Sequence, residues 1–107
     1  MTDIEITKLC AQAMGYTLDA YAKGFRVRDQ DNDVIYIIGE GWGRSQYNPL
    51  HDDAQAMALV KKFEIRISRT LRPAEGWFAE INNNQFGSST DLNRAICECV
   101  AKMEAAK

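Results

Sequence analysis

The sequence contains little histidine, cysteine and proline, and these scarcities exclude several classes of protein. Among 107 residues there are one His, three Cys and two Pro, and no uninterrupted apolar run is longer than five residues. A membrane-spanning helix needs about 20 apolar residues in a row, so none is expected. Three cysteines without framework spacing are expected to be reduced thiols, and the acidic first residues are unlike a signal peptide. The sequence therefore predicts a cytoplasmic protein.

The sequence also lacks the usual residue patterns for binding metals. Cys97 and Cys99 are two positions apart, which on a helix turns them too far from each other to share a metal ion. The segment Asp29–Asp33 alternates Asp like the start of a calcium loop, but Val34 stands where that loop requires Gly. We therefore expect no metal and no cofactor.

Catalysis has only one candidate, and it is the least favoured hypothesis. His51 would need a nearby nucleophile, and the local candidates Ser45 and Tyr47 do not stand in a nucleophile motif. An exposed His at a helix start beside Asp52 and Asp53 is the favoured interpretation of this residue. We therefore expect a protein without catalytic residues.

The composition is that of one ordinary globular domain covering residues 1–107. Hydrophobic residues make up 46% and charged residues 26% of the chain. A net charge of −2 gives no electrostatic reason to expect duplex DNA or an acidic membrane as a partner.

Hydrophobic periodicity and capping signals predict three helices and four to five strands. Thr2 and Glu5 form a capping box before the first helix, and Gly15 follows its end. Asp52 and Gln55 can cap the second helix, and Ser88-x-x-Asp91 resembles a capping box before the third. The helices are expected at about residues 3–14, 50–62 and 89–104. The strands are expected at residues 25–28, 34–38, 63–69 and 77–81, with a short edge strand at 85–87.

The order of these elements predicts the fold class. It is α-β-β-α-β-β-(β)-α, in which segment 17–23 is ambiguous between one more helical turn and a connector. Hairpins joined by helices favour an α+β fold with one antiparallel sheet of four to five strands. We expect the three helices to pack on that sheet in an α/β/α-type sandwich.

The candidate binding residues are aromatic and arginine side chains. Trp42, Arg44 and Tyr47 share the Gly-rich loop Gly39–Leu50, and loops of this length are often functional. Arg66 and Arg69 lie on the strand at 63–69, close in sequence to the aromatic pair at 77–78. Aromatic rings stack on bases and arginine forks bind phosphates, so these five residues are the predicted ligand site.

Several short motifs resemble a known family of small phage proteins. They are Tyr47-Asn48-Pro49-Leu50 with Asp52-Asp53-Ala54-Gln55-Ala56, the end of the first helix at Ala13-Met14-Gly15, and Thr90-Asp91-Leu92-Asn93-Arg94-Ala95-Ile96. On these residues the chain is similar to the phage ABA sandwich family. The resemblance implies an α/β sandwich of phage or prophage origin, and it implies no activity and no catalytic residues.

Phage accessory proteins without catalytic residues commonly act by binding, which is an analogy of origin and fold. Our first hypothesis is a non-enzymatic counter-defence protein that sequesters a small nucleotide immune signal in the host cytoplasm. The alternative is a protein–protein inhibitor that blocks a host defence effector. We also expect a homo-oligomer, most simply a dimer, with the Gly39–Leu50 loop near the interface.

Overall fold

The computed structural model describes residues 1–21, 24–39, 45–70, 76–82 and 85–107. Within these residues the chain forms helices and strands in the order α-β-β-β-α-β-β-β-α. The elements are α1 (Asp3–Ala13), β1 (Thr17–Tyr21), β2 (Gly24–Arg28), β3 (Val34–Gly39), α2 (Asp53–Phe63), β4 (Arg66–Thr70), β5 (Gly76–Ile81), β6 (Gln85–Ser89) and α3 (Leu92–Ala105).

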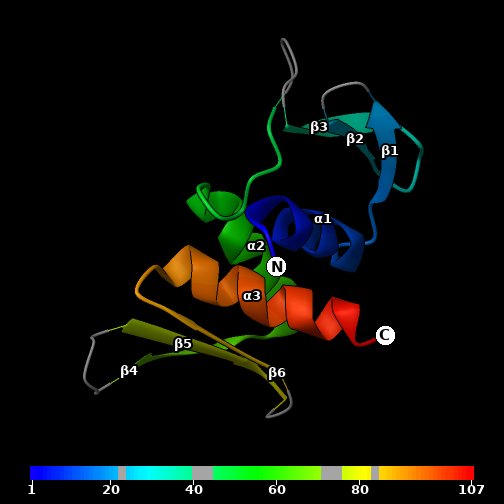
Figure 1. The fold of residues 1–107 in the computed structure, drawn as a ribbon. Coiled ribbons are helices and arrows are strands. Elements are labelled where there is room, and N and C mark those ends of the chain that lie inside the picture. Colours follow the sequence, from blue (N-terminus) through cyan, green and yellow to red (C-terminus); the bar gives the residue numbers. More distant parts are fainter. Residues whose placement is uncertain (22–23, 40–44, 71–75, 83–84) are drawn as a thin grey trace.

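The strands form two separate antiparallel sheets with helices between them (Figure 1). One sheet has the order β1-β2-β3 and the other the order β4-β5-β6. Helix α1 packs against β1 and β3, and α3 packs against β5 and β6. The two helices also pack against each other, and α2 packs against α3. The molecule is elongated along this stack, with extents of 42 × 23 × 22 Å.

The α+β class is confirmed, but the expectation of one sheet in an α/β/α sandwich is wrong. Segment 45–47 lies along β3 and forms backbone hydrogen bonds with it, in the place where a neighbouring strand would pair. The Ile37 amide donates to the Ser45 carbonyl at 2.9 Å, and the Tyr47 amide donates to the Ile37 carbonyl at 2.8 Å. Because this stretch of β3 is already paired, β4 begins a second sheet on the other side of α1 and α3.

The ambiguous segment 17–23 contains a strand, which the sequence did not identify. Thr17–Tyr21 pairs antiparallel with β2, and Asp19 forms an ion pair with Arg28 across the pair. Its burial does not alternate strictly, because Leu18 and Asp19 are both half-buried. The residues Thr17 to Ala20 alternate polar and apolar, but the spacing of Leu18 and Tyr21 is equally compatible with one more helical turn, so a segment this short does not identify a strand.

The first helix begins and ends where its capping signals predict. The Thr2 hydroxyl accepts from the Glu5 amide at 3.2 Å, and Gly15 has the left-handed φ of +86° that follows a helix end. Helix α2 begins later than expected, at Asp53, with the Asp52 carboxylate accepting from the Gln55 amide at 2.9 Å. The segment 49–51 before it is a turn.

The third helix also begins later than expected, and the Ser88 capping box is wrong. Ser88 belongs to β6, and the residue that caps α3 is Asp91, whose side chain makes no capping hydrogen bond. The Asp91 amide instead donates to the Ser89 hydroxyl at 3.1 Å. None of the helices in the described ranges is long and apolar enough to cross a membrane.

The core is built around α3, which lies directly on β6. The largest fully buried side chains include Leu59 of α2, Val27 of β2, and Ile96 and Val100 of α3. At the crossing, Gly87 of β6 is so close to α3 that a Cβ there would lie 2.1 Å from the Ala95 carbonyl oxygen. The two backbones can approach this closely only because the strand has no side chain at that position.

We therefore predict that Gly87→Ala lowers the free energy of unfolding by about 2–3 kcal/mol, since the clash is with backbone that must move. Urea unfolding followed by circular dichroism measures this loss. The control is Ser88→Ala at the neighbouring exposed position, where a change within about 0.5 kcal/mol is expected. Equal stability of the two variants would contradict the close crossing of α3 over β6.

Candidate functional site

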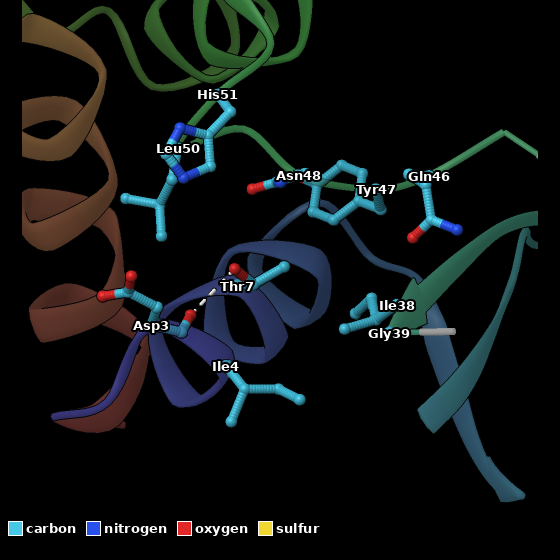
Figure 2. Close-up of a pocket in the computed structure, with 10 residues that line it drawn as sticks. All are labelled: Asp3, Ile4, Thr7, Ile38, Gly39, Gln46, Tyr47, Asn48, Leu50 and His51. Atoms are coloured by element: carbon cyan, nitrogen blue, oxygen red, sulfur yellow. Dashed lines mark hydrogen bonds between the residues drawn. The ribbon is translucent and has the colours of Figure 1, made fainter. Parts of the chain in front are cut away.

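A pocket of about 280 Å³ lies where the start of α1, the end of β3 and segment 46–51 meet (Figure 2). Its lining residues are Asp3, Ile4, Thr7, Ile38, Gly39, Gln46, Tyr47, Asn48, Leu50 and His51. Most of them belong to the two ends of the Gly39–Leu50 loop or adjoin it. The pocket therefore lies beside the loop in which the sequence predicts ligand binding.

The extended backbone at residues 46–48 determines which side chains reach the pocket. Successive side chains of an extended segment point to opposite sides. Tyr47 is buried in the core and is 3% exposed, whereas Gln46 is exposed and Asn48 half-buried. Burial of the Tyr47 ring on one side thus places the Gln46 and Asn48 carboxamides on the other.

One side chain of α2 holds this segment in place. The Gln55 carboxamide accepts from the Asn48 amide at 2.6 Å and donates to the Gln46 carbonyl at 2.7 Å. Gln55 therefore bonds to the backbone on both sides of Tyr47, much as a neighbouring strand would. In the sequence Gln55 was interpreted only as part of the cap of the second helix, so this role was missed.

A tight turn carries the chain from the pocket into α2. The His51 and Asp52 amides both donate to the Asn48 carbonyl at 2.9 Å. Pro49 is fully buried within the turn. The turn leaves His51 exposed at the pocket wall, and Asp52 begins the cap of α2.

Three polar side chains of the pocket wall have no hydrogen-bond partner in the part of the chain that the structure describes. The side chains of Gln46, Asn48 and His51 make no hydrogen bond to any residue that the structure describes. In Figure 2 the Asn48 carboxamide and the His51 imidazole point into the space above α1, and the Gln46 carboxamide lies over Gly39. Their donors and acceptors are therefore available to a ligand.

The polar groups on the α1 side of the pocket are already engaged. The Thr7 hydroxyl donates to the Asp3 carbonyl at 2.8 Å. The Asp3 carboxylate accepts from the Arg94 guanidinium of α3 at 2.7 Å. This ion pair joins the two helices beside the pocket and holds the Asp3 carboxylate at its edge.

Tyr47, a predicted ligand residue, is a core residue in the structure. Its ring contacts Tyr16 edge-on, with centroids 5.9 Å apart, and Tyr36 at 5.3 Å. Its hydroxyl is buried and has no hydrogen-bond partner among the described residues. Burial raises the pKa of Tyr47 well above its ordinary value, and the nearby Cys10 and Cys97 thiols raise that pKa further.

Two other predicted site residues, Arg66 and Arg69, do not lie around Tyr47. Arg66 and Arg69 are exposed on β4, in the sheet on the far side of α1 and α3 (Figure 1). Arg66 Nη1 lies 3.5 Å from Glu80 Oε1, and the Arg69 guanidinium lies 4.9 Å from the Trp77 ring centroid. Trp42 and Arg44 lie outside the described residues.

Arg66 belongs to a second exposed feature, which we call the aromatic face. It is the side of the β4–β6 sheet that points away from α3. Phe78 and Phe86 stack there with ring centroids 5.4 Å apart, and Phe86 is 40% exposed. Cross-strand pairing aligns Arg66 with Glu80, and Glu80 with Phe86.

The cysteines are free and buried, which suits structural thiols. Cys10 Sγ donates to the Cys97 carbonyl at 3.5 Å, and Cys99 Sγ donates to the Gln85 carbonyl at 3.3 Å. Burial raises the pKa of Cys99 to about 11, so its thiol stays protonated and unreactive at neutral pH. Within the described ranges, no three His, Cys, Asp or Glu side chains are grouped so that they could hold a metal.

Comparisons with family models, with curated proteins and with solved structures find no match to this chain.

The role of Tyr47 can be tested with two substitutions. We predict that Tyr47→Phe keeps or raises the free energy of unfolding, by up to about 1 kcal/mol, because it removes an unpartnered buried hydroxyl. Tyr47→Ala should lower it by about 3–5 kcal/mol through loss of the packed ring. Chemical denaturation measures both. A large loss in Tyr47→Phe would show that the hydroxyl makes a bond that stabilises the fold.

Proposed function

We propose that this chain is a non-enzymatic binding protein that holds a small nucleotide-type ligand in the pocket between α1, β3 and segment 46–51. The observation that carries the proposal is that Gln46, Asn48 and His51, whose side chains have no partner among the described residues, line one concave site. Binding sites typically combine apolar walls with a few polar groups that orient the ligand. Here Ile38 and Leu50 supply buried apolar wall.

The support that Gln55 gives to this wall favours binding by a preformed site. A segment held by backbone hydrogen bonds loses little freedom when a ligand arrives, which reduces the entropic cost of binding. The Gln46 and Asn48 backbones are held in this way by Gln55. Their carboxamides are thus presented from a fixed backbone.

The resemblance to the phage ABA sandwich family suggests the biological setting. In that setting the protein acts in the host cytoplasm and sequesters a nucleotide immune signal without hydrolysing it. Sequestration needs affinity for the ligand and no catalytic group.

Calorimetry against a panel of cyclic and ADP-ribose-type nucleotides tests the proposal. We expect Gln46→Ala and Asn48→Ala each to weaken binding of the positive nucleotide by about tenfold, because each removes hydrogen bonds to the ligand. The control is Gln12→Ala, an exposed carboxamide of α1 that does not line this pocket. Binding that survives both pocket variants, or no binding by the folded protein, would overturn the proposal. Recovery of intact nucleotide from the heated complex separates sequestration from hydrolysis.

The aromatic face favours a second candidate function, a protein–protein inhibitor that blocks a host effector. Aromatic and arginine side chains are enriched among the residues that dominate binding energy at interfaces. The exposed Phe86 ring stacked on Phe78 beside Arg66 has this character. The same face is open to a second copy of the chain. A dimer formed there would differ from the one expected from the sequence, because its interface would lie in the other sheet from β3 and not near the Gly39–Leu50 loop (Figure 1).

Light scattering on a sizing column tests self-association. We expect wild-type protein to show twice the 12.1 kDa mass of one chain at high concentration. Phe86→Ser should reduce that mass to one chain, since it removes an exposed ring from the contact. The control is Met57→Ser, a 42% exposed residue of α2. A wild-type mass near 12.1 kDa would contradict the dimer, and an unchanged dimer in Phe86→Ser would exclude the aromatic face as its interface.

A further inference from the structure

The size and charge of the pocket indicate which part of a nucleotide it holds. We propose that the pocket binds the edge of a single adenine-type base and leaves the phosphate of the nucleotide in solvent. This inference rests on the proposed function and specifies the ligand class of the same site. Three properties of the pocket support it: its volume, the chemistry of its free side chains, and the charge at its edge.

The volume suits one base better than a whole dinucleotide. Pockets that enclose drug-sized ligands have volumes of about 300–1,000 Å³. At about 280 Å³ this pocket lies just below that range. Ile38 and Leu50 contribute buried apolar side chains to the wall, and Gly39 adds no side chain to it.

The free side chains match the edge of a base. A carboxamide offers an N–H donor and a carbonyl acceptor side by side, and Asn or Gln pairs in this way with the N6 amino group and N7 of adenine. Gln46 and Asn48 supply two such groups from the same segment, and both are free of partners among the described residues. The His51 imidazole adds a further hydrogen-bonding group at the wall.

The charge at the pocket does not suit a phosphate. No Lys or Arg lines the pocket among the described residues, and Asp3 places a carboxylate at its edge. The nearest cation with a described contact, Arg94, is shared between Asp3 at 2.7 Å and Glu98 at 3.1 Å. Among the described residues, a phosphate at this edge would therefore meet the Asp3 carboxylate and no Lys or Arg of the pocket wall.

The start of α1 does not compensate for this lack of positive charge. A helix N-terminus attracts anions through its unpaired N–H groups and its dipole. Here the Thr2 hydroxyl already accepts from the Glu5 amide, and the first turn carries two carboxylates of its own, Asp3 and Glu5. These side chains already complement the positive end of α1.

A comparison of adenosine with AMP by calorimetry tests the inference. We expect adenosine to bind about as tightly as AMP, within about threefold, and its affinity to change less than about twofold between about 0.05 and 0.5 M NaCl, because no ion pair forms. Guanosine should bind at least about tenfold more weakly, because its edge presents an acceptor where adenine presents a donor. AMP binding at least about tenfold tighter than adenosine, or guanosine binding as tightly as adenosine, would overturn the inference.

A substitution of Asp3 tests independently whether the carboxylate at the pocket edge disfavours a phosphate. Asp3→Asn should raise the ratio of AMP affinity to adenosine affinity by about threefold or more, because it removes the carboxylate from the pocket and leaves Arg94 paired with Glu98 alone of its two described partners. The control is Glu5→Gln, which removes a carboxylate from the same helical turn but not from this pocket. An unchanged ratio in Asp3→Asn would contradict the electrostatic argument.

The outcomes distinguish the inference from the function on which it rests. If AMP and the larger nucleotides bind but adenosine does not, nucleotide binding stands and recognition of the base alone is wrong. If neither nucleosides nor nucleotides bind the folded protein, both the inference and the proposed function are wrong.

Discussion

The packing of α1 against α3 is the contact on which both sheets depend. A three-stranded sheet is stable only when one of its faces is covered, and each sheet here has one face on this pair of helices. The contact is close because small side chains occupy it: Ala11 and Cys10 on α1, and Cys97 and Ala101 on α3, are fully buried. Gly87, which has no side chain, likewise allows α3 to lie close to β6 where the two cross. The pocket depends on this arrangement, because its α1 side is fixed to α3 through Asp3 and Arg94.

Local features of the fold could be predicted from the sequence, and its long-range pairing could not. The Thr2 cap, the stop at Gly15 and the alternation in β4 each depend on neighbouring residues, and the structure confirms them. The division into two sheets depends on the pairing of segment 45–47 with β3, and this segment carries no strand signal in the sequence. The sequence does not show that segment 45–47 pairs with β3, and so it does not show that β4 must join a different sheet.

In the candidate site too, local features could be predicted from the sequence, whereas the placement of side chains by contacts distant in sequence could not. The Gly39–Leu50 loop was identified from its length and glycine content, and the pocket lies at its two ends. The residues predicted there were chosen for their aromatic and cationic chemistry, which is a poor guide to exposure. Tyr47 is buried because segment 46–48 turns it inward, and Arg66 lies in the other sheet. The role of Gln55 requires α2 to pack beside that segment, which no local pattern indicates.

The placement of the two sheets has a consequence for how the chain folds. Each sheet is a meander whose strands follow one another directly in sequence, so each can form from short loops at little entropic cost. By contrast, the contacts that join α1 to α3 link residues close to opposite ends of the chain, such as Asp3 with Arg94 and Cys10 with Cys97. Closing so long a loop is the slow part of assembling this topology. The two halves of the molecule are therefore expected to gain structure early, and docking of the first helix onto the last should determine the folding rate.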